Sequence, residues 1–314
     1  MRSFPSGWNT MLAKLGFVKA KPRKCRQRDK YSRSLRFESL ECRQMLATVT
    51  TLLDVNDPND GVTTLREAIA VTTAGGIVDF ASSLSGGTIT LDRVNLGQIS
   101  FGKSLTIDAS ALSGGIIIDA DDPTPGRTGH GIRIFNITDA SGGSAPPLVT
   151  LVGLTFTGSD VPTNASGGQG GAIRSQVRLI VRDCVFVGNE SLTGGAIFSE
   201  VAGGGATVRE VLRIENSVIE GNDASNGAGV AVVSGNGSFG TPDTILITGT
   251  TISDNWATSF GGGVHATLYG ADVTITDSTL ELNEAGSDGR VASGKRVLVS
   301  LRHGSGDKVL ALAA

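Results

Sequence analysis

The sequence is poor in residue types on which several common protein classes depend. Aromatic residues make up only 5% of the 314 residues, and few stretches could form a long helix. No run of ~18 apolar residues occurs, which excludes a membrane-spanning helix. The cysteines are odd in number and lack a spacing such as C-x-x-C, so the sequence predicts neither a disulfide framework nor a zinc site; they are Cys25, Cys42 and Cys184.

Glycine and small polar residues are abundant instead. The chain contains 44 glycines, and 39% of its residues are hydrophobic, which is enough to bury a real core. Ser, Thr, Asn and Asp fill much of the remainder. This composition favours many short strands joined by tight turns.

Charge is distributed unevenly along the chain. Residues 1–45 hold 12 of the 27 Lys and Arg but only three acids, giving +9, whereas residues 46–314 carry a net charge of −12. A basic head is compatible with binding to nucleic acid or to a membrane surface. We favour targeting, because the head precedes the first predicted strands and lacks the repeat of the body.

The head ends in a motif that supports targeting. Its apolar part, "MLAKLGFVKA", is short and is broken by Lys14 and Lys19, unlike an ordinary signal peptide. The segment "LRFESLECRQMLA", Leu35 to Ala47, resembles the leader motif at the start of many surface and secreted proteins of planctomycete bacteria. Cys42 stands where that motif usually has Asp or Pro. The resemblance implies an address linked to export.

The body of the chain repeats itself. Five segments align at offsets of 30, 33, 33 and 28 residues: "VTLVGLTFTGS" from Val149, "LIVRDCVFVGN" from Leu179, "LRIENSVIEGN" from Leu212, "ILITGTTISDN" from Ile245 and "VTITDSTLELN" from Val273. Such a period is typical of a solenoid in which each repeat supplies one coil.

Two positions of the repeat predict corners. Apolar residues occupy positions 1 and 3, then the alternation slips, so the chain must bend at position 5. Position 5 holds residues that tolerate a left-handed backbone or cap a turn: Gly153, Asp183, Asn216, Gly249 and Asp277. Position 11 predicts a second corner, where stacked amides can form a hydrogen-bonded ladder. This position holds Ser159 in the first segment and asparagine in the other four, namely Asn189, Asn222, Asn255 and Asn283.

A glycine motif follows each second corner and introduces a third strand: "GGAI" at Gly170 and Gly194, "GAGV" at Gly227 and "GGGV" at Gly261. Three short strands per coil, with like residues stacked on like, describe a parallel β-helix. Extra residues collect in "SEVAGGGATVRE" and "SGNGSFGTPDT", which we expect to be loops on one side of the stack.

These residues resemble a known group of proteins. "F-x-x-N" followed by "G-G-A-I", as in Phe186 to Ile197, is similar to the repeat of polymorphic outer-membrane proteins and other right-handed β-helix surface proteins. "TTLREAIAVTTAGGIVDF" resembles the Leu-Arg-Glu-Ala-Ile region that opens such helices, with Thr63 and Thr64 in place of the usual Cys-Ser. The resemblance covers about residues 48 to 286 and implies the right hand of the coil.

The ends of the predicted solenoid differ from its middle. Thr64 and Glu67 fit a capping box, so we expect a short helix that plugs the open end of the core. We divide the chain into a disordered leader (1–47), a cap with the first irregular coils "SLTIDAS", "GIIIDA" and "IRIFNIT" (48–148), regular coils (149–286), and a tail (287–314) that either caps the last coil or continues in a longer protein.

Catalysis has to be judged from residues, because polysaccharide lyases and glycoside hydrolases also occur on β-helices. We find no nucleotide-binding loop, calcium-binding repeat or metal-ligand set, and we assign no catalytic, cofactor-binding or metal-binding residue. Outward acids on adjacent coils are candidates for a glycosidase pair, with a surface histidine beside the third-strand motif: Glu220, Asp254 and His265. The alternative, which we prefer, is that these are solvated residues.

The sequence thus predicts an all-β, right-handed parallel β-helix of the pectin-lyase-like kind, exported to the cell surface, the outer membrane or the medium. We expect a structural or adhesive module without a cofactor, with glycans or a cell-surface protein as partner and without binding to nucleic acid. Two alternatives stay open, namely a polysaccharide-degrading enzyme on the same fold and a passive spacer within a larger surface protein.

Overall fold

The computed structural model describes residues 46–121, 131–140, 146–161, 168–201, 210–234, 243–268, 271–286, 295–301 and 308–312. The chain divides into two compact units, Met1–Cys42 and Arg43–Ala314, and every described residue belongs to the second. The predicted leader up to residue 45 and most of the two predicted loops lie outside the described residues.

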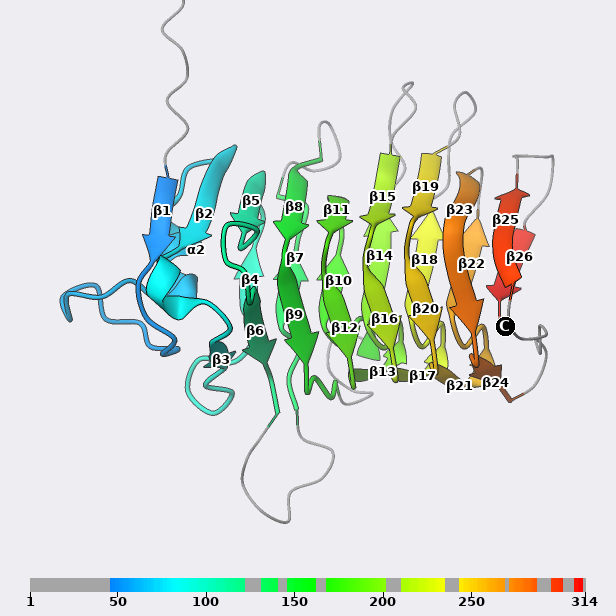
Figure 1. The fold of residues 1–314 in the computed structure, drawn as a ribbon, viewed down its shortest axis with the longest axis horizontal. Helices are drawn as coiled ribbons and strands as arrows, with labels where there is room; N and C mark the ends of the chain where they lie inside the picture. Colours follow the sequence, from blue (N-terminus) through cyan, green and yellow to red (C-terminus); the bar gives the residue numbers. More distant parts are fainter. Residues whose placement is uncertain are drawn as a thin grey trace, which may run out of the picture. The chain divides into compact units, whose positions relative to one another are not determined.

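The second unit is a parallel β-solenoid, in which strands of successive coils lie side by side in long sheets (Figure 1). The largest sheet has two faces that meet in the long strand β23 (Ala271–Glu281). Face A contains β1 (Leu46–Val49), β2 (Gly76–Phe80), β5 (Leu105–Asp108), β8 (Leu148–Val152), β11 (Arg178–Arg182), β15 (Glu210–Glu215), β19 (Asp243–Thr248) and the first part of β23. Face B contains β3 (Thr88–Thr90), β6 (Ile116–Asp119), β9 (Leu154–Thr157), β12 (Val185–Val187), β16 (Val218–Glu220), β20 (Thr251–Ser253) and the second part of β23.

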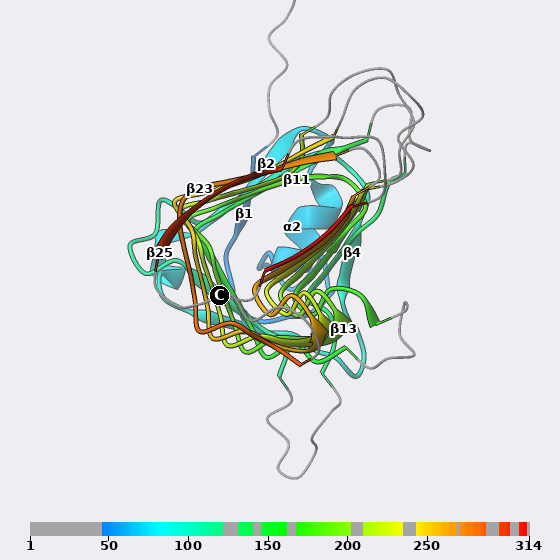
Figure 2. The same cartoon turned by 90° about the vertical axis from the view of Figure 1, so that its right-hand side faces the viewer.

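Two further sheets close each coil. Face C is short and contains β13 (Glu190–Thr193), β17 (Asp223–Asn226), β21 (Trp256–Phe260) and β24 (Glu284–Ala285). Face D contains β4 (Ile99–Phe101), β7 (Phe135–Ile137), β10 (Ile173–Ser175), β14 (Ile197–Val201), β18 (Val230–Ser234) and β22 (Val264–Leu268). Figure 2 looks along the stack and shows the outlines of the coils on top of one another.

The coils that begin at Leu179, Leu212 and Ile245 therefore contain four strands, whereas the sequence predicted three. The additional strand forms face C, directly after the second corner. Its inward positions carry small side chains, and Ala224, Ala257 and Ala228 form a separate cluster of buried residues against which Ala285 packs. Small side chains at these positions let the backbone stay extended close to the core before the glycine turn.

The register of face A is the one that the repeat predicts. Leu179 pairs with Val149 on one side and with Leu212 on the other. The next coils continue this row, with Leu212 paired to Ile245 and Ile245 to Val273. The four offsets read from the sequence are thus the spacing between residues that stack in space.

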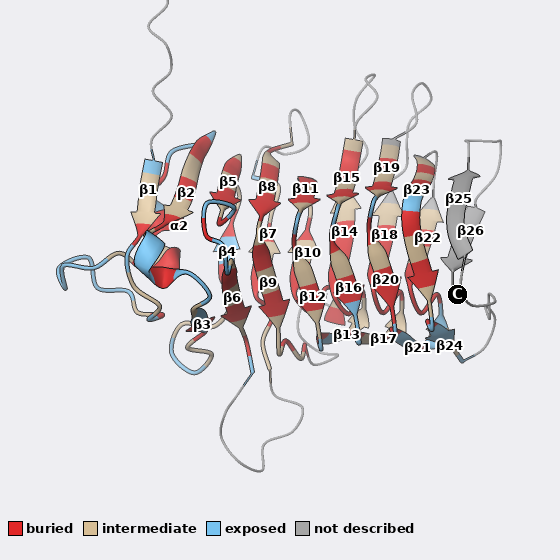
Figure 3. Ribbon diagram, in the orientation of Figure 1, coloured by how far each residue is buried: buried red, intermediate tan, exposed pale blue. Residues whose placement is uncertain are grey.

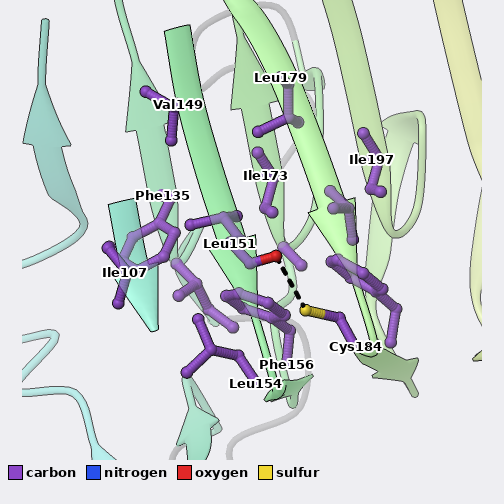
Figure 4. Close-up of a cluster of buried hydrophobic side chains, with 14 of the residues drawn as sticks. Ile107, Phe135, Val149, Leu151, Leu154, Phe156, Ile173, Leu179, Cys184 and Ile197 are labelled. Atoms are coloured by element: carbon purple, nitrogen blue, oxygen red, sulfur yellow. Dashed lines mark hydrogen bonds between the residues drawn. The ribbon is translucent and has the colours of Figure 1, made fainter. Parts of the chain in front are cut away.

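The interior is a continuous apolar core. Buried and partly exposed residues alternate along most strands, with the buried ones directed inward (Figure 3). Phe156 and Phe186, on neighbouring coils, stack with ring centroids 4.8 Å apart and planes at 12°, while Phe135 meets Phe156 edge to face at 5.6 Å. Figure 4 shows the rings of Phe135 and Phe156 among branched aliphatic side chains such as Leu151 and Leu154. Close packing of this kind provides most of the stabilisation of the coil stack.

At the first coil, helix α2 (Leu65–Val71) contacts β1, β2 and β4 and lies inside the outline of the coils (Figure 2). Its first turn has the capping box: the Thr64 hydroxyl accepts from the backbone N–H of Glu67, and the Glu67 carboxylate accepts from that of Thr64. Leu65, Ala68 and Ile69 are buried. The helix is further fixed by a two-pronged contact of Arg66 with Asp54.

Two features of the first coils differ from the expectation. Strand β1 begins at Leu46 and pairs with β2, so the last two residues of the predicted leader belong to the fold, because their backbone completes the edge of face A. The segments expected to be separate irregular coils, "SLTIDAS", "GIIIDA" and "IRIFNIT", contain β5, β6 and β7, which are three sides of one coil.

The end of the chain pairs with the last coil in the opposite sense. Strand β25 (Lys295–Leu301) runs antiparallel to β23, and β26 (Lys308–Leu312) runs antiparallel to β22. These are the only antiparallel pairs among the described strands. They pair with the strand edges that β23 and β22 present to the end of the chain. Within the described part of the chain, no helix is both long and apolar enough to cross a membrane.

Candidate functional site

The second corner carries a ladder of asparagine side chains that runs from coil to coil. The side-chain oxygen of Asn222 accepts from both the backbone N–H and the amide of Asn189, each at 3.0 Å. Asn255 accepts in the same way from Asn222, at 3.1 and 2.9 Å, and Asn283 from Asn255, at 3.3 and 2.8 Å. All four side chains are buried. In the coil before Asn189, the hydroxyl of Ser159 donates to its side-chain oxygen at 2.9 Å.

Each of these amides also satisfies backbone carbonyls around the corner. Asn222 donates to the carbonyl of Phe186 on the preceding coil at 3.2 Å and to that of Glu220 on its own coil at 3.0 Å. Asn255 repeats the pattern with Ile219 and Ser253. A buried polar group without such partners would cost free energy, so the ladder serves the fold by satisfying the corner backbone.

The first corner depends on residues with a left-handed backbone. All five residues at position 5 have positive φ, between 49° at Asn216 and 68° at Gly153. The sequence did not indicate that position 10, just before the asparagine, needs the same conformation. There φ is positive at Gly158, Gly188, Gly221, Asp254 and Leu282.

Position 6 forms a second buried ladder beside the first corner. The hydroxyl of Ser217 accepts from the backbone N–H of Cys184 at 3.2 Å. The hydroxyls of Thr250 and Ser278 accept in the same way from the backbone N–H of the residue at position 6 on the preceding coil. Each hydroxyl donates to a carbonyl two residues earlier. Cys184 occupies the same position, where burial raises the pKa of its thiol to about 12. The cysteine is a core residue, with its sulfur near the carbonyl of Leu151 (Figure 4).

The glycines after the second corner are required by close backbone approach. A Cβ on Gly195 would lie 2.5 Å from the carbonyl oxygen of Ala228 on the next coil. At Gly262 it would lie 2.3 Å from that of Glu284. No side chain fits in these spaces, so the glycine motif lets the short strand of face C turn into face D.

The three candidate surface residues lie on two different faces. Glu220 is exposed at the end of β16 on face B and pairs with Ser253, as the repeat predicts. Asp254 is exposed at the following corner with φ of 55°, and its N–H donates to the carbonyl of Glu281. His265 lies on face D, half-buried. The coil therefore does not bring His265 to the two acids, and no group of three potential metal ligands occurs among the described residues.

His265 instead belongs to an aromatic pair. Its ring lies nearly parallel to that of Phe260, with centroids 6.2 Å apart and planes at 21°. Desolvation by burial lowers the pKa of His265, which favours the neutral imidazole. The glycine turn at residues 261–263 brings the two residues together, because it joins the end of β21 to the start of β22.

Position 12, directly after the asparagine, forms an outward row that we call the corner row. It consists of Asp160, Glu190, Asp223, Trp256 and Glu284, paired coil by coil. Burial raises the pKa of Glu190, and the charges of Asp160 and Asp223 raise it further. Burial also raises the pKa of Asp223. The repeat alignment contains this row, but only the structure shows that its side chains point outward.

Trp256 interrupts the corner row with a large exposed ring. It is 48% exposed, and Phe260, four residues later on the same strand, is 41% exposed. The preceding coils have short or polar residues at these places, namely Asp223 and Glu190 beside Trp256, and Asn226 and Thr193 beside Phe260. The two rings therefore stand out on face C.

Two shallow pockets lie near the first coils. One, of about 550 Å³, is lined by Arg66, Phe101, Lys103 and Thr138 among others. Its cations already have partners: Arg66 binds Asp54, and Lys103 donates to the carbonyls of Ala70 and Thr72 at the end of α2. The other, of about 520 Å³, lies between residues 50–54 and β3.

The residues that recur in every coil thus build the scaffold, whereas the outward residues differ from coil to coil. Comparison of the chain with known proteins finds no matching family model, no matching curated protein and no matching solved structure.

Proposed function

We propose that this protein is an exported right-handed parallel β-helix that acts at the cell surface or outside the cell as a structural and adhesive module. One observation carries the proposal. The polar side chains that recur from coil to coil, above all Asn189, Asn222 and Asn255, are buried and bonded to one another and to the corner backbone. The repeat therefore maintains a rigid stack, while its outward positions are free to present different side chains.

Export and the hand of the coil are supported by the resemblances in the sequence. The segment Leu35 to Ala47 resembles a leader of exported proteins, and Phe186 to Ile197 resembles the repeat of right-handed β-helix surface proteins. A stack with paired or covered edges also suits an extracellular environment, because open strand edges would promote aggregation.

The adhesive role is tested with the purified full chain. We expect it to be retained on whole cells or on one immobilised glycan, and to release neither reducing ends nor unsaturated uronates from a polysaccharide panel, with or without calcium. As a matched control, the destabilised variant Asn222→Leu should lose retention at a lower urea concentration than the unaltered chain, together with its folded structure. Release of product would contradict the proposal in favour of an enzyme, and absence of both product and retention would contradict it in favour of a spacer.

A further inference from the structure

The exposed rings on β21 are the strongest unassigned feature of the surface. Trp256 and Phe260 are both exposed and lie four residues apart on one short strand, and Phe260 is backed by the nearly parallel ring of His265. Exposed aromatic rings on a rigid strand supply contact area at little cost in conformational entropy, and such rings dominate binding energies at interfaces. None of the described residues that pair with Trp256 or Phe260 is aromatic.

Trp256 is flanked by carboxylates on both neighbouring coils. Asp223 is its register partner on one side and Glu284 on the other. Ionised carboxylates only accept hydrogen bonds, so a ligand lying on the ring must offer donors at its edges. They also attract positive charge, and the face of an indole ring does the same. An acidic polymer would be repelled from this place.

A glycan fits the indole ring and the two flanking carboxylates better than a folded protein does. The apolar face of a pyranose ring stacks on an aromatic ring, and its hydroxyl groups point outward as donors. Stacked coils are ~4.8 Å apart, which is roughly the length of one sugar unit, so a chain lying across Trp256 can place its next units beside Asp223 and Glu284. A protein partner with an interface of standard size would bury about 800 Å² of accessible surface on this chain. Polar residues border the two rings, so the apolar surface here is small.

We infer that Trp256 and Phe260 form a binding site for a glycan of amino sugars, with a pyranose ring stacked on Trp256 and ammonium groups beside Asp223 and Glu284. The inference rests on the proposed function, because it names the ligand of the adhesive surface. The sugar is recognised by its ring and its charge together, which separates it from a neutral glycan, an acidic glycan and a basic peptide.

Four probes separate these contributions: a glucosamine oligomer, the N-acetylglucosamine oligomer of the same length, an oligogalacturonate and an oligolysine. The chain contains two tryptophans, Trp8 and Trp256, so in the full-length variant Trp8→Phe the indole fluorescence reports Trp256 alone. We expect the glucosamine oligomer to change this fluorescence saturably, with at least about tenfold tighter binding than the N-acetylated oligomer. Addition of salt should weaken it, because exposed charges are screened.

Variants test each contact. Trp256→Ala, measured by calorimetry, should abolish binding of the glucosamine oligomer, and Phe260→Ala should weaken it about tenfold. Asp223→Asn and Glu284→Gln should weaken binding of the glucosamine oligomer but leave the N-acetylated oligomer unchanged. Val94→Ala removes an even more exposed apolar side chain elsewhere and should have no effect.

Three results of the binding measurements would overturn the inference. The first is that the acidic oligomer binds as tightly as the glucosamine oligomer, and the second is that the N-acetylated oligomer does so. The third is that oligolysine binds more tightly than the glucosamine oligomer and loses this binding in Trp256→Ala, a result that would assign a basic peptide as the ligand. Retention of Trp256→Ala on cells at the level of the unaltered chain would also overturn it, while leaving the adhesive function intact. If the unaltered chain, Trp256→Ala and Val94→Ala all fail to be retained on cells, the adhesive function itself is contradicted.

Discussion

The amide of Asn222 donates to the side-chain oxygen of Asn255 over 2.9 Å, and both residues are almost completely buried. This contact joins two residues that are 33 positions apart in the chain but occupy the same corner of neighbouring coils. It is one rung of a ladder that links Asn189 to Asn283, so the corner is held by side chains as well as by the strand ladders on either side.

Replacement of Asn222 by leucine should destabilise the protein. Leucine cannot accept from the backbone N–H of Asn189 or donate to the carbonyl of Phe186, and buried groups left unpaired cost about 1–3 kcal/mol each. We expect the free energy of unfolding in urea to fall by at least this amount. Glu220→Gln, at an exposed position of the same coil, should stay within about 0.5 kcal/mol of the unaltered protein. Equal urea midpoints for Asn222→Leu and the parent would refute the ladder.

Replacement of Leu282 by asparagine should stabilise the protein. Leu282 has φ of 56°, a left-handed conformation that costs an ordinary side chain about 1–2 kcal/mol and that asparagine adopts more readily. We expect a gain of about 1 kcal/mol in the free energy of unfolding. Leu53 is also 60% exposed but does not have positive φ, so Leu53→Asn should give no such gain. If both variants change stability alike, the effect comes from exposed leucine and not from backbone strain.

Glu190 should make stability depend on pH. Burial, Asp160 and Asp223 raise the pKa of Glu190 above its ordinary value of 4.5, so the folded state holds the proton more tightly than the unfolded chain. Glu190 therefore lowers the free energy of unfolding as the pH rises from about the pKa of this group in the unfolded chain through its pKa in the folded protein. Glu190→Gln should be more stable than the parent at pH 7, by a few tenths of a kcal/mol because the side chain is exposed to solvent.

The advantage of Glu190→Gln should disappear below the unfolded pKa of 4.5, where the glutamate is protonated in both states. Urea unfolding at a series of pH values measures this directly. Glu220→Gln, outside the corner row, serves as the control for loss of a surface charge. A difference that stays constant across the series would show that repulsion and burial at Glu190 are not its cause.

Cys184 should be inert in the folded protein. Burial raises the pKa of its thiol to about 12, so almost no thiolate exists at pH 8 and a reagent cannot reach the sulfur. In a full-length variant with Cys25→Ser and Cys42→Ser, we expect no modification by a thiol reagent at pH 8 until urea unfolds the chain. Rapid modification under native conditions would place the residue outside the core.

Much of the architecture could be predicted because stacking imposes a period. Residues that meet in space, such as Leu179 and Leu212, recur at the offsets seen in the sequence, so alignment of the chain with itself gives the register of face A. The same alignment singles out the asparagines at the second corner and the residues with positive φ at the first. Thr64 and Glu67 mark the start of α2 for a local reason, since a capping box involves only one turn of helix.

Other features could not be predicted, because they depend on how separate segments meet. The additional strand on face C needs both an extended backbone and an inward row of small residues such as Ala224 and Ala257. The antiparallel pairing of β25 with β23 joins strands without a repeat in common. Trp256 is exposed because the corner turns its position outward, which no property of the residue indicates.

The sequence by itself thus determined the repeat, the corners and the order of the strands, because backbone conformation and inward polarity at each position depend on residue type. Only the tertiary structure decided that position 12 of the repeat points outward, where the strand edges are closed, and that the exposed ring of Trp256 stands between two carboxylates on face C. These features depend on where the chain turns and which segments meet, and the period of the sequence gives only the register.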